Sequence, residues 1–300
     1  MKQIKRKRDA AALNSRLIRR PIQRMVWLFL LPTFATFCIG FLYPFLQGVF
    51  LSFCKFKVIS QWDWVWFDNY IKAFSDSSFL HAFWFTALFT VVSTICINVA
   101  ALSIALALTR EIKGTNLFRS VFFMPNLIGG IVLGYIWNIL LNCVLTLLGK
   151  PLLSLHAPYG FIGLVILMCW QQIGYMMIIY IAGLQSIPND YLEAARIDGA
   201  NERQILWKVK LPNLMPSITI CLFLSLTNGF KLFDQNLALT GGDPAHKTEM
   251  LALNIYQTFY GRSGPQWKGY GQAKAVLFCI LVVVIGLVQL KATRSKEVQQ

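Results

Sequence analysis

The chain has 300 residues, of which 56% are hydrophobic and only 14% are charged, and its formal net charge is +15. Soluble domains carry about 25% charged residues, so this composition excludes an ordinary water-soluble protein and indicates a polytopic membrane protein. The positive charge does not favour nucleic acid as a partner, because it is concentrated beside hydrophobic stretches, where Lys and Arg set topology and meet anionic lipid.

Six long uncharged stretches follow one another along the chain. A helix needs about 20 apolar residues to cross a hydrocarbon core roughly 30 Å thick, because in lipid each backbone amide must bond within its own segment. The last stretch is long enough only if it begins near Gly271 and accepts Lys274 near its outer end, where a long side chain snorkels. We therefore expect an all-α membrane protein with six transmembrane helices, over residues 26–54, 82–109, 120–149, 151–189, 211–230 and 275–290.

The basic residues predict how these helices are oriented. Residues 1–24 hold nine of the 28 Lys and Arg residues, so the positive-inside rule places this end in the cytoplasm, and six crossings return the C-terminus to the same side. The predicted organisation is a basic segment (1–24), a six-helix domain (25–292) and a cytoplasmic tail (293–300). The first hydrophobic stretch is too long for a cleavable signal and is expected to remain as an anchor.

The outer segment after the first predicted helix is rich in aromatic residues. It carries Trp62, Trp64, Trp66, Phe67 and Tyr70, and such side chains favour the head-group level because one end is apolar and the other polar. We expect this segment to lie along the outer surface. Both interfacial anchoring and docking of an external partner remain open.

The most polar internal stretch, residues 189–217, lies between the fourth and fifth predicted helices on the cytoplasmic side. Asp190 and Glu193 have the spacing of a capping box, which predicts a short helix that ends near Gly199. Asn201 and Gln204 repeat that spacing and predict a second helix. Ile205, Leu206 and Val209 then share one face of that helix. The segment is thus predicted to be a helix, a glycine turn and a helix.

The same stretch resembles the EAA motif of permease subunits of bacterial ABC importers. Glu193-Ala194-Ala195, Gly199 and Leu211-Pro212 stand at the offsets of that motif, which chance would produce on the order of once in ten million positions. Val209, where Ile is commoner, is a minor departure. The resemblance implies a coupling helix seated in a separate ATPase subunit through Glu193, Ala194, Ala195, Asp198, Gly199, Ala200, Leu211 and Pro212. The alternative is an amphipathic helix that only rests on the membrane.

A second resemblance narrows the solute. The run NGFKLFDQNLALTGGDP (228–244), with LPTFATFCIGFLYPFLQGVFLSF and FDNY near the start, is similar to permeases of the maltose and multiple-sugar type. It implies a subunit of a binding-protein-dependent importer for a sugar or oligosaccharide in the bacterial cytoplasmic (inner) membrane. The implied partners are a second, related permease, two ATPase subunits that bind ATP and Mg, and an extracellular binding protein. Lys231 and Asp234 are three positions apart at the outer end of the fifth helix, so they can pair if that helix continues through them, either as a gate or docking contact or as a local rim ion pair.

Polar and aromatic residues inside the predicted helices mark a possible solute pathway. Amides bond hydroxyl groups in both senses, and flat rings suit the apolar faces of pyranoses. Equally, buried amides often hold membrane helices together. The candidates are Trp170, Gln171, Gln172 and Tyr175 of the fourth helix, Asn228 and Phe230 of the fifth, and Asn126 and Asn138 of the third.

Catalysis on this chain is not expected. The seven cysteines form no C-x-x-C pair, the three histidines lack metal-ligand spacing, and no Walker, G-x-S-x-G or H-E-x-x-H motif occurs. We expect no cofactor and no metal, so energy for transport must come from an ion gradient or from another polypeptide. Remaining alternatives are an ABC importer for glycerol phosphate or a polyamine, a secondary transporter, and a scaffold without transport.

Overall fold

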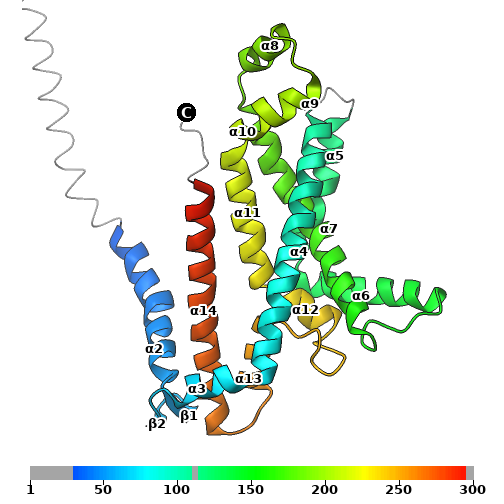
Figure 1. Ribbon diagram of the computed structural model, residues 1–300. Coiled ribbons are helices and arrows are strands. Elements are labelled where there is room, and N and C mark those ends of the chain that lie inside the picture. Colours follow the sequence, from blue (N-terminus) through cyan, green and yellow to red (C-terminus); the bar gives the residue numbers. More distant parts are fainter. Residues whose placement is uncertain (1–29, 110–113, 295–300) are drawn as a thin grey trace, which may run out of the picture.

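The computed structural model describes residues 30–109 and 114–294 (Figure 1). The basic segment 1–24 therefore lies outside the described residues. The described chain is helical apart from one small β-hairpin, as an all-α membrane fold predicts. Its elements are η1 (Cys38–Leu42), α2 (Tyr43–Leu51), β1 (Cys54–Val58), β2 (Gln61–Trp64), α3 (Asp68–Ser75), α4 (Ser77–Leu108), α5 (Thr115–Phe123), η2 (Met124–Leu127), α6 (Gly130–Leu147), α7 (Ala157–Gln185), α8 (Asn189–Ile197), α9 (Glu202–Ile205), η3 (Leu206–Lys210), α10 (Leu211–Asn213), α11 (Met215–Phe230), α12 (Asp234–Leu239), α13 (Leu251–Tyr260) and α14 (Pro265–Arg294).

Five helices in the described residues are long and apolar enough to cross a membrane. A sixth crossing is obtained if the bent pair Glu202–Asn213 and Met215–Phe230, which turns by 69°, counts as one span. The predicted number of six agrees with this count. The C-terminal end of α14 lies at the same end of the bundle as α8 and α9, whereas β1, β2 and α3 lie at the opposite end (Figure 1).

The span predicted over residues 120–149 is divided into two helices, α5 and α6. The helical path is interrupted by the short 3-10 turn η2, which contains the buried Pro125, and by extended backbone at Ile128 and Gly129. Proline has no N–H to continue the helical hydrogen-bond ladder. As a result α5 runs beside α7, while α6 leaves across the direction of α4, α11 and α14 (Figure 1).

The last span also differs from its prediction. Helix α14 begins at Pro265, earlier than Gly271, and Lys274 does not snorkel, because it is 0% exposed. Its ammonium donates to Asp76 Oδ2 at 2.8 Å, Asn254 Oδ1 at 2.9 Å and Thr258 Oγ1 at 3.1 Å. These three acceptors satisfy the three N–H donors of the ammonium, which would otherwise bond to water.

The aromatic outer segment folds as the β1–β2 hairpin followed by α3, and it packs against α14. Buried Asn69 joins α3 to the start of the hairpin, because its Nδ2 donates to the carbonyl oxygens of Ser52 at 2.8 Å and Cys54 at 3.0 Å. Trp62, Trp64 and Trp66 remain exposed on the hairpin and the turn after it. The segment lies at the end of the bundle that the charge distribution predicts to be external (Figure 1).

The core forms where α4, α7 and α11 pack together. Tyr180 donates its hydroxyl to Asn98 Oδ1 at 2.7 Å, and Asn98 Nδ2 donates to Ser225 Oγ at 2.8 Å, so one chain of hydrogen bonds joins the three helices. On the neighbouring α7–α5 contact, a Cβ at Gly174 would lie 1.8 Å from the carbonyl oxygen of Phe122. Only glycine permits this approach, which holds α5 against α7.

Candidate functional site

The polar segment between α7 and α11 begins one residue earlier than its predicted cap. Helix α8 starts at Asn189, with Pro188 in the N-cap position and no side-chain capping bond, so the expected capping role of Asp190 is wrong. Pro188 with its extended backbone starts the helix here. Asp190 lies in the first turn, where its negative charge is favourable near the helix N-terminus.

The end of α8 agrees with the predicted glycine turn. Gly199 has φ of 78°, a left-handed conformation that L side chains rarely adopt. The N–H of Ala200 donates to the carbonyl of Ala195 at 2.9 Å, and the N–H of Gly199 donates to that of Arg196 at 3.0 Å. This pair of bonds is a Schellman motif, which satisfies carbonyls at the helix end and reverses the chain.

The second predicted cap is present. Gln204 N donates to Asn201 Oδ1 at 2.9 Å and Asn201 N donates to Gln204 Oε1 at 2.8 Å, which completes a capping box at the start of α9. Helix α9 continues through a π-helical turn, η3, into α10, and the chain then bends by 69° into α11. Two local motifs therefore fix the turn between α8 and α9 and the start of α9.

The surface of this segment is polar, but it also exposes a few large apolar side chains. Ile205 is buried beneath it and, with the half-buried Leu206 and Val209, forms the predicted inner face. By contrast Ile197 is 85% exposed and Trp207 is 66% exposed. The Arg196–Glu202 ion pair, at 3.5 Å and well exposed, adds little stability. An exposed apolar surface on a folded loop is typical of a contact site for another protein.

The candidate pathway amides bond to groups on neighbouring elements of the chain. Gln235 Nε2 donates to Gln171 Oε1 at 2.7 Å, Gln171 Nε2 donates to the carbonyl of Ile128 at 3.3 Å, and Asn228 Nδ2 donates to Gln172 Oε1 at 3.4 Å. The amides thus join α7 to η2, α11 and α12. These contacts match the helix-joining role that membrane amides often have.

The other pathway candidates lie in different surroundings. Trp170 is well exposed and meets Trp137 with ring centroids 5.5 Å apart, whereas Tyr175 is half-buried beside Phe123. Phe230 is buried at the end of α11. Of the third-helix residues, Asn138 donates to the carbonyl of Leu239 at 2.6 Å, and Asn126 is half-buried in η2. Their contact with a solute stays a prediction.

The expected Lys231–Asp234 pair does not form, although both residues are described. Helix α11 ends at Phe230, Lys231 is its C-cap, and Asp234 begins the separate helix α12. The two residues therefore do not share one helix face, which the pairing required.

Comparison with known families decides the identity of the fold. Residues 97–292 match the family described as "Binding-protein-dependent transport system inner membrane component". The chain belongs to this family. The matched region covers α7, the helix–turn–helix of α8 and α9, and α11 to α14.

Individual relatives of this inner membrane component agree with the family match. A probable starch degradation products transport system permease from Thermoanaerobacterium thermosulfurigenes is 42% identical over 91% of the chain and 95% of its own length. A multiple sugar-binding transport system permease from Streptococcus mutans is 32% identical over 91% and 96%. A subunit chain in the crystal structure of a bacterial ABC transporter for alginate import superposes with a TM-score of 0.78, covering 93% and 98% at 20% identity.

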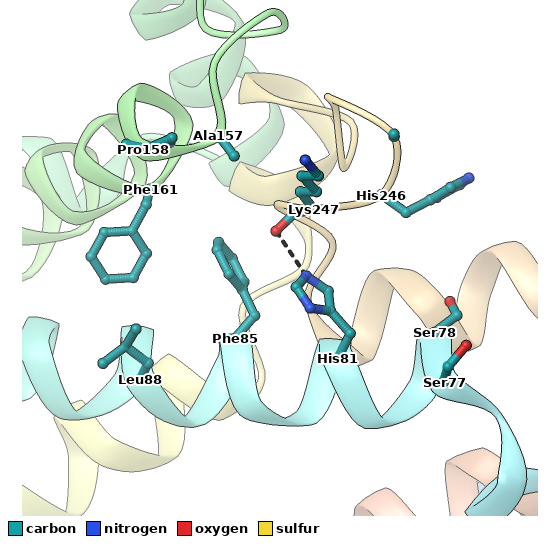
Figure 2. Close-up of a pocket in the computed structure, with 11 residues that line it drawn as sticks. Ser77, Ser78, His81, Phe85, Leu88, Ala157, Pro158, Phe161, His246 and Lys247 are labelled. Carbon is teal, nitrogen blue, oxygen red and sulfur yellow. Dashed lines mark hydrogen bonds between the residues drawn. The ribbon is translucent and has the colours of Figure 1, made fainter.

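The predicted outer end of the inner membrane component contains a cavity of about 640 Å³ that the sequence did not indicate. Figure 2 shows His81, Phe85 and Leu88 rising from α4 toward Phe161 of α7 and Lys247 of the loop between α12 and α13. His81 Nε2 lies 3.1 Å from the carbonyl oxygen of Lys247. This cavity is largely apolar and holds none of the predicted pathway residues.

A buried charge cluster beside this cavity was also missed. Besides Lys274, Asp76 accepts from Tyr270 Oη at 2.6 Å and caps α4 by accepting from Ser78 N at 2.9 Å. Burial alone would raise the pKa of Asp76, but the bonds from Lys274 and Tyr270 outweigh burial and hold that pKa below its usual value. The cluster joins α4, α13 and α14.

The loop before α13 contributes a second buried carboxylate. Glu249 is 2% exposed and lies 2.9 Å from Nδ1 of His246, whose side chain is exposed. Burial raises the pKa of Glu249, although contacts with His246, Lys274 and Asn254 oppose the rise. In the described residues no group of three or more His, Cys, Asp or Glu side chains has the arrangement of a metal site.

Proposed function

We propose that this chain is the transmembrane permease subunit of an ATP-driven ABC importer for a sugar or oligosaccharide. The family match and the 42% identical relative, which is named for starch degradation products, carry the proposal. The chain itself hydrolyses nothing. ATP and Mg are bound by two separate ATPase subunits, and a binding protein delivers the solute from outside.

The helix–turn–helix at residues 189–210 supports the ATPase contact. It projects from the end of the bundle that the charge rule predicts to be cytoplasmic (Figure 1). Its two helices are fixed by the Schellman motif and the capping box, and it exposes Ile197 and Trp207. A rigid projection transmits force, because it is not deformed when a partner moves against it, and its exposed apolar side chains give the partner a surface to pack against. Glu193, Ala194, Ala195, Asp198, Gly199, Ala200, Leu211 and Pro212 are the proposed coupling residues.

The external partner follows from the family and from one solved structure. The family description names binding-protein dependence. A second alginate transporter structure, solved in complex with a periplasmic protein carrying an alginate pentasaccharide, superposes with a TM-score of 0.76 over 92% of the chain. The β1–β2 hairpin and α3 form the outer platform in our proposal, and their exposed Trp62, Trp64 and Trp66 are placed to meet such a protein.

A second, related permease completes the pathway in this proposal. The Leu30–Leu51 span is exposed over nearly its whole length, and its Phe34, Phe37, Phe41 and Phe45 face outward. The amides inside the six spans already bond to each other, so a single chain leaves little room for a solute. A two-subunit bundle provides that room at the junction between the subunits.

The solute class rests on the relatives and on the chemistry of the candidate pathway. Trp170, Gln171, Gln172, Tyr175, Asn228 and Phe230 supply amides and aromatic rings, which suit neutral hydroxylated ligands. Some relatives are named for sn-glycerol 3-phosphate, such as a permease from Brucella abortus that is 26% identical over 92% of the chain. A phosphorylated solute is therefore the alternative to be tested.

Co-purification and uptake test the proposal together. A tagged copy, extracted in mild detergent, is expected to recover a second permease and an ATPase, and cells are expected to take up labelled maltodextrins in preference to glycerol 3-phosphate. Gly199→Pro and Glu193→Lys should abolish uptake while the protein still reaches the membrane. Lys150→Gln removes an exposed charge from the loop between α6 and α7, outside both the coupling loop and the outer platform; it serves as the control and should leave uptake intact. Normal uptake in both loop variants contradicts the coupling assignment.

A further inference from the structure

A pocket with a basic side chain lies between α5 and α7, close to the end of the bundle that carries α8. Its volume is about 290 Å³. Arg119, Ser120 and Gln185 form its polar part, and Phe123, Ile178, Ile181 and Ala182 form its apolar part. This pocket has no part in the proposed transport mechanism.

Arg119 is incompletely satisfied. Its Nε atom is buried and has no hydrogen-bond partner in the described chain, and no ion pair joins its guanidinium to a described carboxylate. A buried guanidinium donor without an acceptor is costly, and the fork of Arg donors matches the oxygens of phosphate and carboxylate. Among the described residues, the pocket therefore lacks an anionic acceptor.

The geometry of the two helices explains why the pocket stays open. At Gly174 the backbones of α7 and α5 touch, since a Cβ there would lie 1.8 Å from Phe122 O. Toward the predicted cytoplasmic end the same helices leave the space that Arg119 and Gln185 border. The apolar residues Leu117, Phe118 and Val121 of α5 are exposed around it. In a membrane this surface faces acyl chains rather than water.

We propose that the pocket binds the head-group phosphate of an anionic phospholipid of the inner leaflet. The phosphate accepts from Arg119, and the start of an acyl chain covers Phe123 and Ile178. Basic pockets between transmembrane helices on the cytoplasmic side recognise such head groups. The position also agrees with the sequence, which places Arg110 and Lys113 in the connection just before α5. This inference requires that the chain lies in a membrane, and it does not depend on which solute is imported.

Lipid titration of the full-length chain, purified in a maltoside detergent and followed by native mass spectrometry, tests this site. Phosphatidylglycerol should bind at least about tenfold more tightly than phosphatidylcholine with the same acyl chains, a difference of about 1.4 kcal/mol. Arg119→Gln should remove that preference, and Arg119→Lys should retain part of it. Lys291→Gln, which removes an exposed charge from the same end of the bundle, is the matched control and should bind as the wild type does.

Other results of the same experiment overturn the proposal. Equal binding of the two lipids, or an equal loss in Lys291→Gln, means that the pocket has no specific role. Displacement of the lipid by inorganic phosphate at the same concentration means that the pocket serves a soluble anion. If Arg119→Gln does not fold, Ala182→Phe is used, because it fills the pocket and leaves Arg119 in place. Unchanged lipid preference in Ala182→Phe also refutes the site.

Discussion

Replacing Lys274 by Met tests whether the buried cluster holds the outer end of the bundle together. Met keeps the length and much of the apolar volume of the lysine stem but removes the ammonium. The change leaves Asp76 with two donors, Tyr270 Oη and Ser78 N, and deprives it of its only ion-pair partner in the described chain. Asn254 and Thr258 lose the donor that joins α13 to α14.

The size of the effect follows from burial. Removing one partner of a buried ion pair costs about 3–5 kcal/mol, because the remaining charge is left without compensation. The side chain of Asp76 is 21% exposed, so water solvates part of the carboxylate that remains. We therefore expect Lys274→Met to cost about 3 kcal/mol, at the lower end of that range. Asp76→Asn should cost about 5 kcal/mol, because it leaves a wholly buried ammonium unpaired.

The assay is unfolding of the purified chain by titration from a mild detergent into SDS. The double variant should be destabilised by less than the sum of the two single variants, since the second change removes the charge that the first left unpaired. Lys72→Met is the matched control. It breaks another Lys–Asp pair, at 2.7 Å, whose side chains are about half exposed, and its effect should lie within the error of measurement.

Two results refute this reasoning. One is a cost for Lys274→Met no larger than that of Lys72→Met, which means that the buried contacts do not hold α13 and α14 together. The other is a smaller cost for Asp76→Asn than for Lys274→Met. That order means that the ammonium is not isolated from water in the folded protein.

Three further predictions concern the pH response and the helix contacts. Because the pKa of Glu249 is raised by burial, wild-type stability should fall as pH rises from 4.5 through the folded-state value, and Glu249→Gln should flatten the unfolding midpoint against pH. Gly174→Ala should cost several kcal/mol in the SDS titration and separate α5 from α7, because the new Cβ meets Phe122 O; an unchanged midpoint contradicts this packing. Asn98→Leu should cost about 1–2 kcal/mol by leaving Tyr180 unpaired, whereas a neutral result means that water or another group accepts the bond.

The polar loop was predictable because its structure is local. The Gly199 turn and the Asn201–Gln204 capping box are formed by residues at most five positions apart, so their spacing in the sequence contains all the geometry they need. The start of α8 was predicted less well. Asp190 and Glu193 have the spacing of a capping box, but Pro188 provides the helix start instead.

The interrupted third span shows where hydrophobicity is insufficient. Residues 120–149 are uncharged throughout, and length and polarity alone favour one continuous helix. A proline such as Pro125 disfavours a continuous helix, but it does not determine the direction of the chain afterwards. That direction is set by packing, because the glycines at the start of α6 lie against α12, with a Cβ at Gly130 placed 2.7 Å from Asp234 Cβ.

Lys274 shows most clearly why tertiary contacts limit prediction from sequence. A lysine near the end of an apolar helix satisfies its charge either by reaching the interface or by meeting an acceptor inside the protein, and the helix sequence is the same in both cases. The deciding residue, Asp76, is 198 positions away and precedes a different span. Because α13 supplies two more acceptors, all three donors of the ammonium are bonded without water. The charge therefore anchors three helices to one another, where the sequence alone favoured an anchor to the membrane surface.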